Sequence, residues 1–230
     1  MQSQQKKKSS GNTKSILSDI NDILAISDSY QAPDRMLQIV LQKDKKERDK
    51  IYLSLADYFK NDYSKDWFWE YFQEEHADRH QNKQDFTPPS IASLIHNILH
   101  GGFHKEKADH TEVTYDPAAG TGQLLIRDWY LTRQNYMPWD YKPNEHLVVC
   151  SELSVKTIPF LLFNLSVRGI CGLVIHMNTM TGEIVNNYIL SNPENSTICF
   201  SDVTVMPKID TPKTEEQVKN YIPTQLKIFE

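Results

Sequence analysis

The chain has 230 residues, of which 39% are hydrophobic and 24% charged, and this composition excludes an intrinsically disordered protein. Its formal net charge of −5 argues against a protein that binds duplex DNA tightly by itself, because such affinity comes from neutralising phosphates. No apolar run reaches the roughly 18 residues of a membrane-spanning helix, and the basic N-terminus lacks the apolar stretch of a secretory signal, so no membrane association is expected. The three cysteines, Cys150, Cys171 and Cys199, fit no zinc pattern, which predicts reduced, buried thiols in a cytoplasmic protein.

The N-terminal third is predicted to be helical behind a disordered tail. Residues 1–14 are polar and basic and are expected to be disordered. Apolar residues recur at three- and four-residue spacing from Ile16 to Ile26, which predicts an amphipathic helix, and a second helix is expected over Asp34–Gln42. The charged run Lys43–Lys50 mixes acids with bases, which favours a solvated helix face or turn over a nucleic-acid patch.

An aromatic-rich stretch over residues 51–80 has spacings compatible with a helix. We expect these rings to pack against the following domain, because acids such as Asp66 and Glu70 among them disfavour a base-stacking platform. The predicted organisation is a disordered tail over 1–14, a helical region over 15–80, an α/β domain over 81–207 and a C-terminal tail over 208–230.

Strand and helix signals alternate after residue 86. TPPSIASLIHNIL predicts a helix that starts at Thr87-Pro88 and ends at Gly101-Gly102. Its apolar residues are expected to share one face: Ile91, Leu94, Ile95, Ile98 and Leu99. Strands are predicted over 112–116, 146–152 and 172–177, helices over 122–134 and 155–169, and two further short strands within 186–192 and 196–207. This order predicts an α/β fold with a parallel sheet, helices on its faces and ligands bound beyond the carboxyl ends of its strands.

The strongest candidate for a binding site is TYDPAAGTGQLL, Thr114–Leu125, where a strand ends, a small-residue turn follows and a helix begins. Small residues such as Ala118 and Gly120 let a ligand approach the backbone, and the turn and helix N-terminus offer N–H donors. Asp116 at the strand end suits a cationic group such as an α-amino group. The glycines are only Gly120 and Gly122, so the G-x-G-x-x-G fingerprint of nicotinamide enzymes is absent.

An acidic residue, Glu152, ends the next predicted strand, where carboxylates bond ribose hydroxyls in sheets of this kind.

The histidine pairs are weaker signals. His96 and His100 have the i, i+4 spacing of metal ligands, but they lack the H-E-x-x-H pattern, so no metal site is predicted.

These residues resemble a known family, the N6-adenine DNA methyltransferases, and especially the modification subunits of type I restriction systems. DPAAGTGQLL is similar to the family's D-P-A-x-G-[ST]-G-x-[FL]-L motif, and Phe86-Thr87-Pro88 to its F/Y-T-P segment. LLFNLSVRG, residues 161–169, resembles its A-x-x-N-L-x-x-x-G helix segment, and Asn178-Thr179-Met180 stands where the family has Asp-Thr-Leu. The resemblance covers about residues 85–180 well and the rest loosely.

The resemblance implies an incomplete Rossmann-like sheet of the S-adenosylmethionine-dependent methyltransferases, preceded by a helical region. It implies S-adenosyl-L-methionine as the cofactor and DNA as the substrate, with a specificity or restriction subunit as a possible partner. The cofactor contacts that it implies are Phe86, Thr87, Pro88, Asp116, Pro117, Ala118, Gly120, Gly122, Glu152 and Asn178.

The family's catalytic motif, Asn/Asp-Pro-Pro-Tyr/Phe, does not occur in this sequence. Its nearest counterparts are Asn192-Pro193, the candidate catalytic residues, and the segment Asp202–Pro207, which has the pattern of the fourth strand but ends in Met-Pro-Lys. The resemblance also implies more strands than the five or so expected here, and a target-recognition region.

Three functions therefore stay open. The first is an active or partner-completed N6-adenine DNA methyltransferase. The second is a catalytically degenerate S-adenosylmethionine-binding protein that acts as a regulator or an anti-restriction decoy of phage or mobile-element origin. The third is a methyltransferase for a protein or a small molecule.

Overall fold

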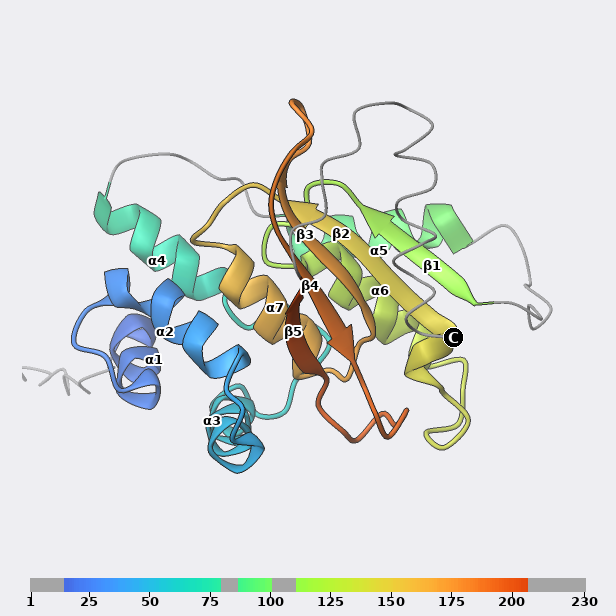
Figure 1. Ribbon diagram of the computed structural model, residues 1–230, viewed down its shortest axis with the longest axis horizontal. Helices are drawn as coiled ribbons and strands as arrows, with labels where there is room; N and C mark the ends of the chain where they lie inside the picture. The colour runs from blue at the N-terminus through green and yellow to red at the C-terminus, as the bar shows by residue number, and fades with distance from the viewer. Residues whose placement is uncertain (1–14, 80–86, 101–110, 207–230) are drawn as a thin grey trace, which may run out of the picture.

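The computed structural model describes residues 15–79, 87–100 and 111–206 (Figure 1). The helices are α1 Ile16–Leu24, α2 Ala32–Val40, α3 Lys45–Tyr58, α4 Trp69–Arg79, α5 Pro89–His100, α6 Gln123–Arg133 and α7 Ile158–Ser166, with short 3-10 turns at Ser29–Gln31 and Pro143–Glu145. The strands are β1 Glu112–Asp116, β2 His146–Glu152, β3 Gly172–Asn178, β4 Glu183–Ser191 and β5 Asp202–Met206. The predicted tails over 1–14 and 208–230 and the predicted stop at Gly101-Gly102 lie outside the described residues.

The described strands form one sheet in the order β1-β2-β3-β4-β5. The β1, β2 and β3 strands are parallel, as their alternation with α6 and α7 predicts, whereas β4 runs antiparallel to both of its neighbours. A tight turn joins β3 to β4, in which Asn178 O accepts a hydrogen bond from Gly182 N at 2.7 Å. The mixed sheet with packed helices confirms the expected α/β class.

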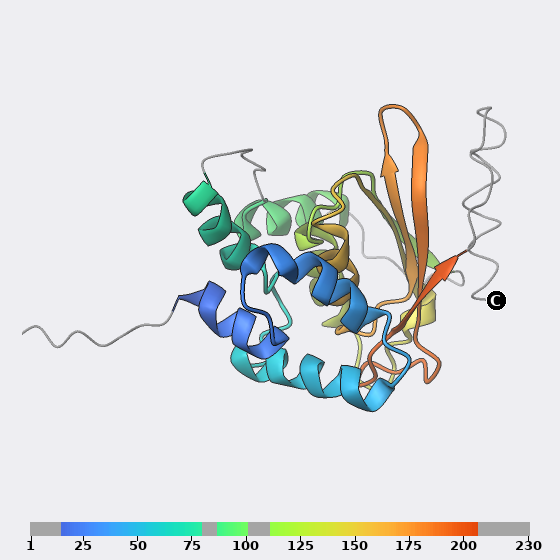
Figure 2. The same ribbon diagram turned by 60° about the vertical axis from the view of Figure 1, so that its left-hand side comes forward.

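In the part of the chain that the structure describes, the helices lie on one side of the sheet (Figures 1 and 2). The sequence predicted helices on its faces, and the strand order explains the difference. Because the order advances from β1 to β2 to β3 in one direction, two right-handed crossovers place α6 and α7 on the same face. The later strands are joined by turns and loops, which add no helix to the other face.

The core joins the N-terminal helices to the sheet. Phe160 and Phe163 of the entirely buried α7 are fully buried, and the Phe160 ring lies 4.7 Å from that of Phe68 and 4.9 Å from that of Phe72. The aromatic stretch thus packs as predicted. One hydrophobic cluster runs from Ile20 on α1 to Leu190 on β4, so the predicted boundary at residues 80 and 81 separates two segments that share a core.

From Lys45 on, the charged run Lys43–Lys50 forms the first part of α3, and it is not wholly solvated. Asp44 caps the helix by accepting a hydrogen bond from Lys46 N at 3.0 Å. Arg48 is only 4% exposed and donates to Asp202 Oδ1 at 2.8 Å, while the exposed Lys45 reaches Asp202 Oδ2 at 2.6 Å. The run therefore ties α3 to the start of β5.

Helix α5 turns its predicted apolar face outward. Leu94 is 54% exposed and Ile98 71% exposed, whereas Ala92 is buried. The face that meets α6 is small and polar instead: Arg127 Nε donates to Ser93 Oγ at 2.9 Å, and His96 Nδ1 lies 2.7 Å from Asp128 Oδ1. Hydrophobic periodicity predicted that the apolar face of α5 is buried, whereas α5 contacts α6 through these polar side chains.

Two features bear on the environment of the protein. Cys150 and Cys171 are buried, as predicted, Cys199 is partly exposed, and each carries a free thiol. Within residues 15–79, 87–100 and 111–206, no helix has the length and apolar character needed to cross a membrane.

Candidate functional site

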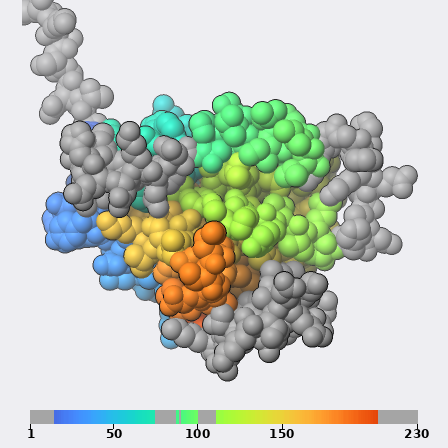
Figure 3. Space-filling view, turned by 90° about the horizontal axis from the view of Figure 1, so that it is seen from above, coloured from blue at the N-terminus to red at the C-terminus, as the bar shows by residue number. Residues whose placement is uncertain are grey.

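Three predicted cofactor residues end adjacent parallel strands. Asp116 is the last residue of β1, Glu152 of β2 and Asn178 of β3. Figure 3 shows the molecule from this end, with α5 in green, the loop after β1 in lime green, the segment after β2 in gold and the β3–β4 hairpin in orange. Parallel pairing therefore brings residues that are far apart in the sequence to one edge of the sheet.

The loop between β1 and α6 is tied to the ends of both strands. Ala118 N donates to Asp116 Oδ1 at 3.0 Å, Ala119 N to Ser151 O at 2.9 Å and Gly120 N to Glu152 Oε2 at 2.8 Å. The two acids of the candidate site thus fix the small-residue loop between them.

Asp116 has a buried oxygen that no described group satisfies. The residue is 9% exposed; Oδ1 accepts from Ala118 N, whereas Oδ2 is buried and lacks a hydrogen-bond partner. Burial raises the pKa of Asp116, opposed by the hydrogen bond from Ala118 and reinforced by the charge of Glu152. A buried carboxylate oxygen calls for a donor, and a cationic ligand group at this point would satisfy it.

Glu152 is partly exposed and keeps capacity for a ligand. Its Oε1 accepts from Ser154 N at 2.7 Å and its Oε2 from Gly120 N at 2.8 Å. Each carboxylate oxygen can accept a second hydrogen bond, so the side chain can still bind hydroxyls. His176 on β3 is the register partner of Glu152, and its Nε2 atom lies 3.1 Å from the carbonyl oxygen of Leu153.

The loop glycines differ in their surroundings. Both have positive φ, 56° at Gly120 and 96° at Gly122. A Cβ added at Gly120 would meet nothing within 4 Å, whereas one at Gly122 would lie 3.0 Å from Leu161 Cδ1. Gly120 therefore faces open space that a ligand can use, and Gly122 lets α6 pack against α7.

The remaining predicted contacts are placed less centrally. Pro117 and Ala118 are exposed in the loop, and Thr87 and Pro88 immediately precede α5, while Phe86 lies outside the described residues. Asn178 uses its Oδ1 to accept from Met180 N at 3.0 Å and Thr181 N at 3.3 Å. Its amide oxygen thus shapes the hairpin turn.

The structure does not bring the candidate catalytic residues Asn192 and Pro193 to the cofactor residues. Because β4 is antiparallel to β3, Asn192 follows the end of β4 that pairs with Gly172, at the amino end of β3. Its Nδ2 lies 3.2 Å from Gly169 O and 2.8 Å from Ser196 O. These contacts hold Asn192 in the loop after β4, at the opposite end of the sheet from Asp116 and Glu152, so the expected catalytic role finds no support in its position. The other imperfect counterpart, β5, lies at the edge of the sheet opposite β1.

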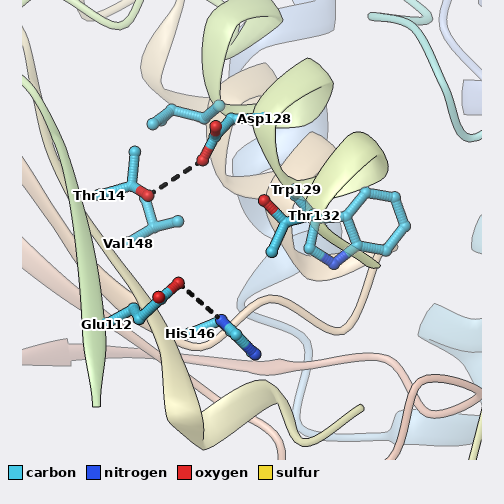
Figure 4. Close-up of a pocket in the computed structure, with 8 residues that line it drawn as sticks. Glu112, Thr114, Asp128, Trp129, Thr132, His146 and Val148 are labelled. Atoms are coloured by element: carbon cyan, nitrogen blue, oxygen red, sulfur yellow. Dashed lines mark hydrogen bonds and ion pairs between the residues drawn. The ribbon is translucent and has the colours of Figure 1, made fainter. Parts of the chain in front are cut away.

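A cavity of about 20 Å³ lies between β1, β2 and α6 (Figure 4). Thr114 Oγ1 donates to Asp128 Oδ2 at 3.1 Å, and His146 Nδ1 lies 3.4 Å from Glu112 Oε2, whereas His146 Nε2 is buried without a hydrogen-bond partner among the described residues. The volume fits about one water molecule. A cavity of this size is far too small for a cofactor. Glu112 and His146 are the first residues of their strands, so the cavity also lies toward the end of the sheet opposite Asp116 and Glu152.

Residues 117–122, between β1 and α6, form what we call the glycine loop. Sequence reasoning missed a buried polar cluster that contacts this loop, formed by Asp66, Thr121, Asn164 and Arg168. Asp66 was predicted to be one of several acids around an aromatic stretch, whereas it is 4% exposed and contacts Thr121 and Asn164. One signal was available: Asn164 is the asparagine of the segment LLFNLSVRG.

The N-6 DNA methylase family model matches residues 60–223, which is more than half of the chain. The chain belongs to the N-6 DNA methylase family. The match confirms the resemblance that DPAAGTGQLL indicated, and with the observed sheet it supports the expected incomplete Rossmann-like methyltransferase fold. It also includes α4, which the predicted organisation placed before the α/β domain. No match to the chain was found among curated proteins.

Proposed function

We propose that the chain binds S-adenosyl-L-methionine at the carboxyl ends of β1 and β2 and methylates the N6 atom of adenine in DNA, in the manner of a type I modification subunit. The observation that carries the proposal is Asp116 Oδ2, a buried acceptor without a partner beside a loop with open space at Gly120. A small-molecule donor, such as an ammonium group, suits this position.

The residues of the site fit the chemistry of this cofactor, which supplies a methyl group bound to a positively charged sulfur. Asp116 would accept from the α-amino group, and Glu152 from the ribose hydroxyls. Two carboxylates in one site also favour a cation. Ala118 and Gly120 let the ligand approach the backbone closely.

Three further parts of the site follow from the family resemblance. The segment Phe86-Thr87-Pro88 is proposed to pack over the methionine part of the cofactor. Pro117 and Gly122 are proposed to shape the loop beside the cofactor. Asn178 is proposed to bind the adenine ring of the cofactor through its Nδ2, because its Oδ1 already accepts a hydrogen bond from Met180 N.

DNA methylation would require a partner chain. The net charge of −5 leaves little electrostatic attraction for phosphates, so DNA contacts would come from a specificity or restriction subunit. The position of β1 supports this idea, because β1 carries Asp116 and forms one edge of the sheet in the described part of the chain. A partner could therefore reach the cofactor residues from that side.

A second candidate function is favoured by the position of Asn192. Its amide is bonded within the loop after β4, away from Asp116 and Glu152, and the sequence has no Asn-Pro-Pro-aromatic motif. On this second proposal the protein binds the cofactor without transferring its methyl group, as a regulator or an anti-restriction decoy.

Methyl transfer separates the two candidates. The protein would be incubated with S-adenosylmethionine labelled in its methyl group and adenine-containing DNA, with and without a specificity subunit and a restriction subunit of a type I system. Label in N6-methyladenine that disappears in Asp116→Ala supports the enzyme. Cofactor binding without labelled base under both conditions supports the binding protein and contradicts the first proposal.

A further inference from the structure

A buried carboxylate holds the glycine loop from behind. Asp66 lies between α3 and α4 and is only 4% exposed. Its Oδ1 accepts from Phe68 N at 2.9 Å and from Asn164 Nδ2 at 2.8 Å, and its Oδ2 accepts from the Thr121 hydroxyl. Its backbone N also donates to Gln123 Oε1 at 3.1 Å. The segment before α4 is thus bonded to the loop and to the first residue of α6.

Thr121 is held at two points. It stands between Gly120 and Gly122, which both have positive φ, and glycine gives a backbone wide conformational freedom. Asp66 binds its hydroxyl, and its carbonyl O accepts from Asn164 Nδ2 at 2.9 Å. Contacts from outside the loop therefore restrict the part of it that is intrinsically the most flexible.

The cluster provides the polar partners that a buried carboxylate needs. Burial raises the pKa of Asp66, and the hydrogen bonds from Thr121, Phe68 and Asn164 oppose this effect. Arg168 is 2% exposed and donates to Asn164 O at 2.6 Å, which fixes the residue that bridges Asp66 and Thr121. Such a fully bonded polar network restrains its members to one arrangement.

We infer that Asp66 is a positioning residue that fixes the glycine loop for cofactor binding, so that a segment outside the α/β sheet sets the affinity of the site. The inference rests on the proposed function. Asp66 acts through Thr121: a fixed Thr121 restricts the adjoining Gly120, whose N–H donates to Glu152 at 2.8 Å. An unrestrained loop would have to be ordered at the expense of binding free energy.

The test compares four variants of the full chain. Thr121→Val removes the hydroxyl with little change of volume, Asp66→Ala removes the carboxylate, and Thr121→Ser keeps the hydroxyl. The matched control is Tyr52→Phe, which removes a buried hydrogen bond of 3.1 Å from Tyr52 to Ser166 between α3 and α7. The readouts are affinity for S-adenosylmethionine by calorimetry, amide hydrogen exchange of residues 118–123 without ligand, and stability in denaturant.

We expect Thr121→Val and Asp66→Ala to weaken binding about tenfold or more and to accelerate exchange over residues 118–123. Thr121→Ser keeps the hydroxyl and should bind with an affinity within about twofold of wild type. Tyr52→Phe should lower stability without changing cofactor affinity or hydrogen exchange in the loop. Wild-type affinity and exchange in both Thr121→Val and Asp66→Ala would overturn the inference, as would a Tyr52→Phe protein that binds as weakly as they do.

The proposed function can fail separately. If the wild-type protein does not bind S-adenosylmethionine, the proposed cofactor site is overturned. Loop exchange in Thr121→Val then still decides the role of Asp66, because unchanged exchange contradicts the positioning and accelerated exchange supports it.

Discussion

At the scale of single residues, Asp116 joins the loop geometry to the proposed chemistry. Its Oδ1 fixes the turn through Ala118, whereas its buried Oδ2 has no partner. Burying an acceptor without a donor costs about 1–3 kcal/mol, so the site is less stable without ligand than the rest of the core. A ligand that donates to this oxygen would recover that cost, and we therefore expect substitutions of Asp116 to weaken binding of the proposed cofactor.

The raised pKa of Asp116 predicts two opposite pH dependences. Cofactor affinity should fall as pH decreases through the raised pKa, because the neutral acid no longer attracts an ammonium group. The ligand-free protein should instead gain stability from Asp116 in the same direction: a raised folded pKa contributes stability below the unfolded pKa, and this is lost as pH rises through the folded pKa. Calorimetry and denaturation across pH check both effects. In Asp116→Asn both should vanish, and an unchanged affinity profile in that variant would contradict the assignment.

The two loop glycines should separate binding from stability. Gly120→Ala introduces strain at φ 56° but no clash, so a stability loss of about 1 kcal/mol is expected together with weaker cofactor binding, because its Cβ enters the ligand space. In Gly122→Ala, the new Cβ would lie close to Leu161 in addition to the backbone strain at φ 96°, so we expect the free energy of unfolding to fall by about 2–3 kcal/mol. Denaturant unfolding measures both. A larger loss in Gly120→Ala than in Gly122→Ala would contradict the loop geometry.

At the scale of elements, the ion pairs of α3 should stabilise the position of β5. Asp202→Asn should lower the free energy of unfolding by about 2 kcal/mol, because Arg48 is 4% exposed and loses a charged acceptor. The pKa of Asp202 is lowered: burial would raise it, but hydrogen bonds from Lys45 and Arg48 outweigh that. Its contribution is therefore present above the unfolded pKa and lost as pH falls through the folded pKa.

Lys45→Met is the control for this pair, because the Lys45 side chain is 60% exposed and its ion pair is screened. A loss of less than about 1 kcal/mol is expected. Equal losses for the two variants would show that the buried Arg48 is not the important partner.

Helices α7 and α5 should respond very differently to truncation. Phe160 on α7 is fully buried against Phe68 and Phe72, so Phe160→Ala should cost about 3–5 kcal/mol. Leu94 on α5 is 54% exposed, and Leu94→Ala should change stability by no more than about 0.5 kcal/mol. Equilibrium denaturation checks both, and a large loss at Leu94 would show that the apolar face of α5 is covered.

The elements could be predicted from sequence where the pattern is local. The first two strands were predicted to the residue. The run 146–152 is apolar and buried, whereas the short strand 112–116 is largely half-buried or exposed and ends directly before the small-residue turn. The orientation of α5 could not be predicted, because it depends on contacts such as His96 with Asp128 that join residues 32 positions apart. Periodicity reports which residues are apolar, and not which neighbour the helix meets.

At the scale of the whole molecule, the strand ends and the glycine loop were predictable, whereas the support behind them was not. Asp116 and Glu152 meet because parallel strands end at one edge, which the β-α-β order implies. Asp66 reaches Thr121 across 55 residues, and its burial depends on the packing of α4 against α7. The antiparallel β4 likewise depends on a turn after Asn178, and it carries Asn192 away from the site.

Calorimetric titration of the full chain with S-adenosylmethionine, with Asp116→Asn as the matched variant, tests the central claim most directly. The account predicts saturable one-to-one binding by the wild-type protein and affinity at least about tenfold weaker in Asp116→Asn, whose far-ultraviolet circular dichroism should match wild type. No binding by the folded wild-type protein, or equal affinity in the two proteins, would contradict the proposed cofactor site.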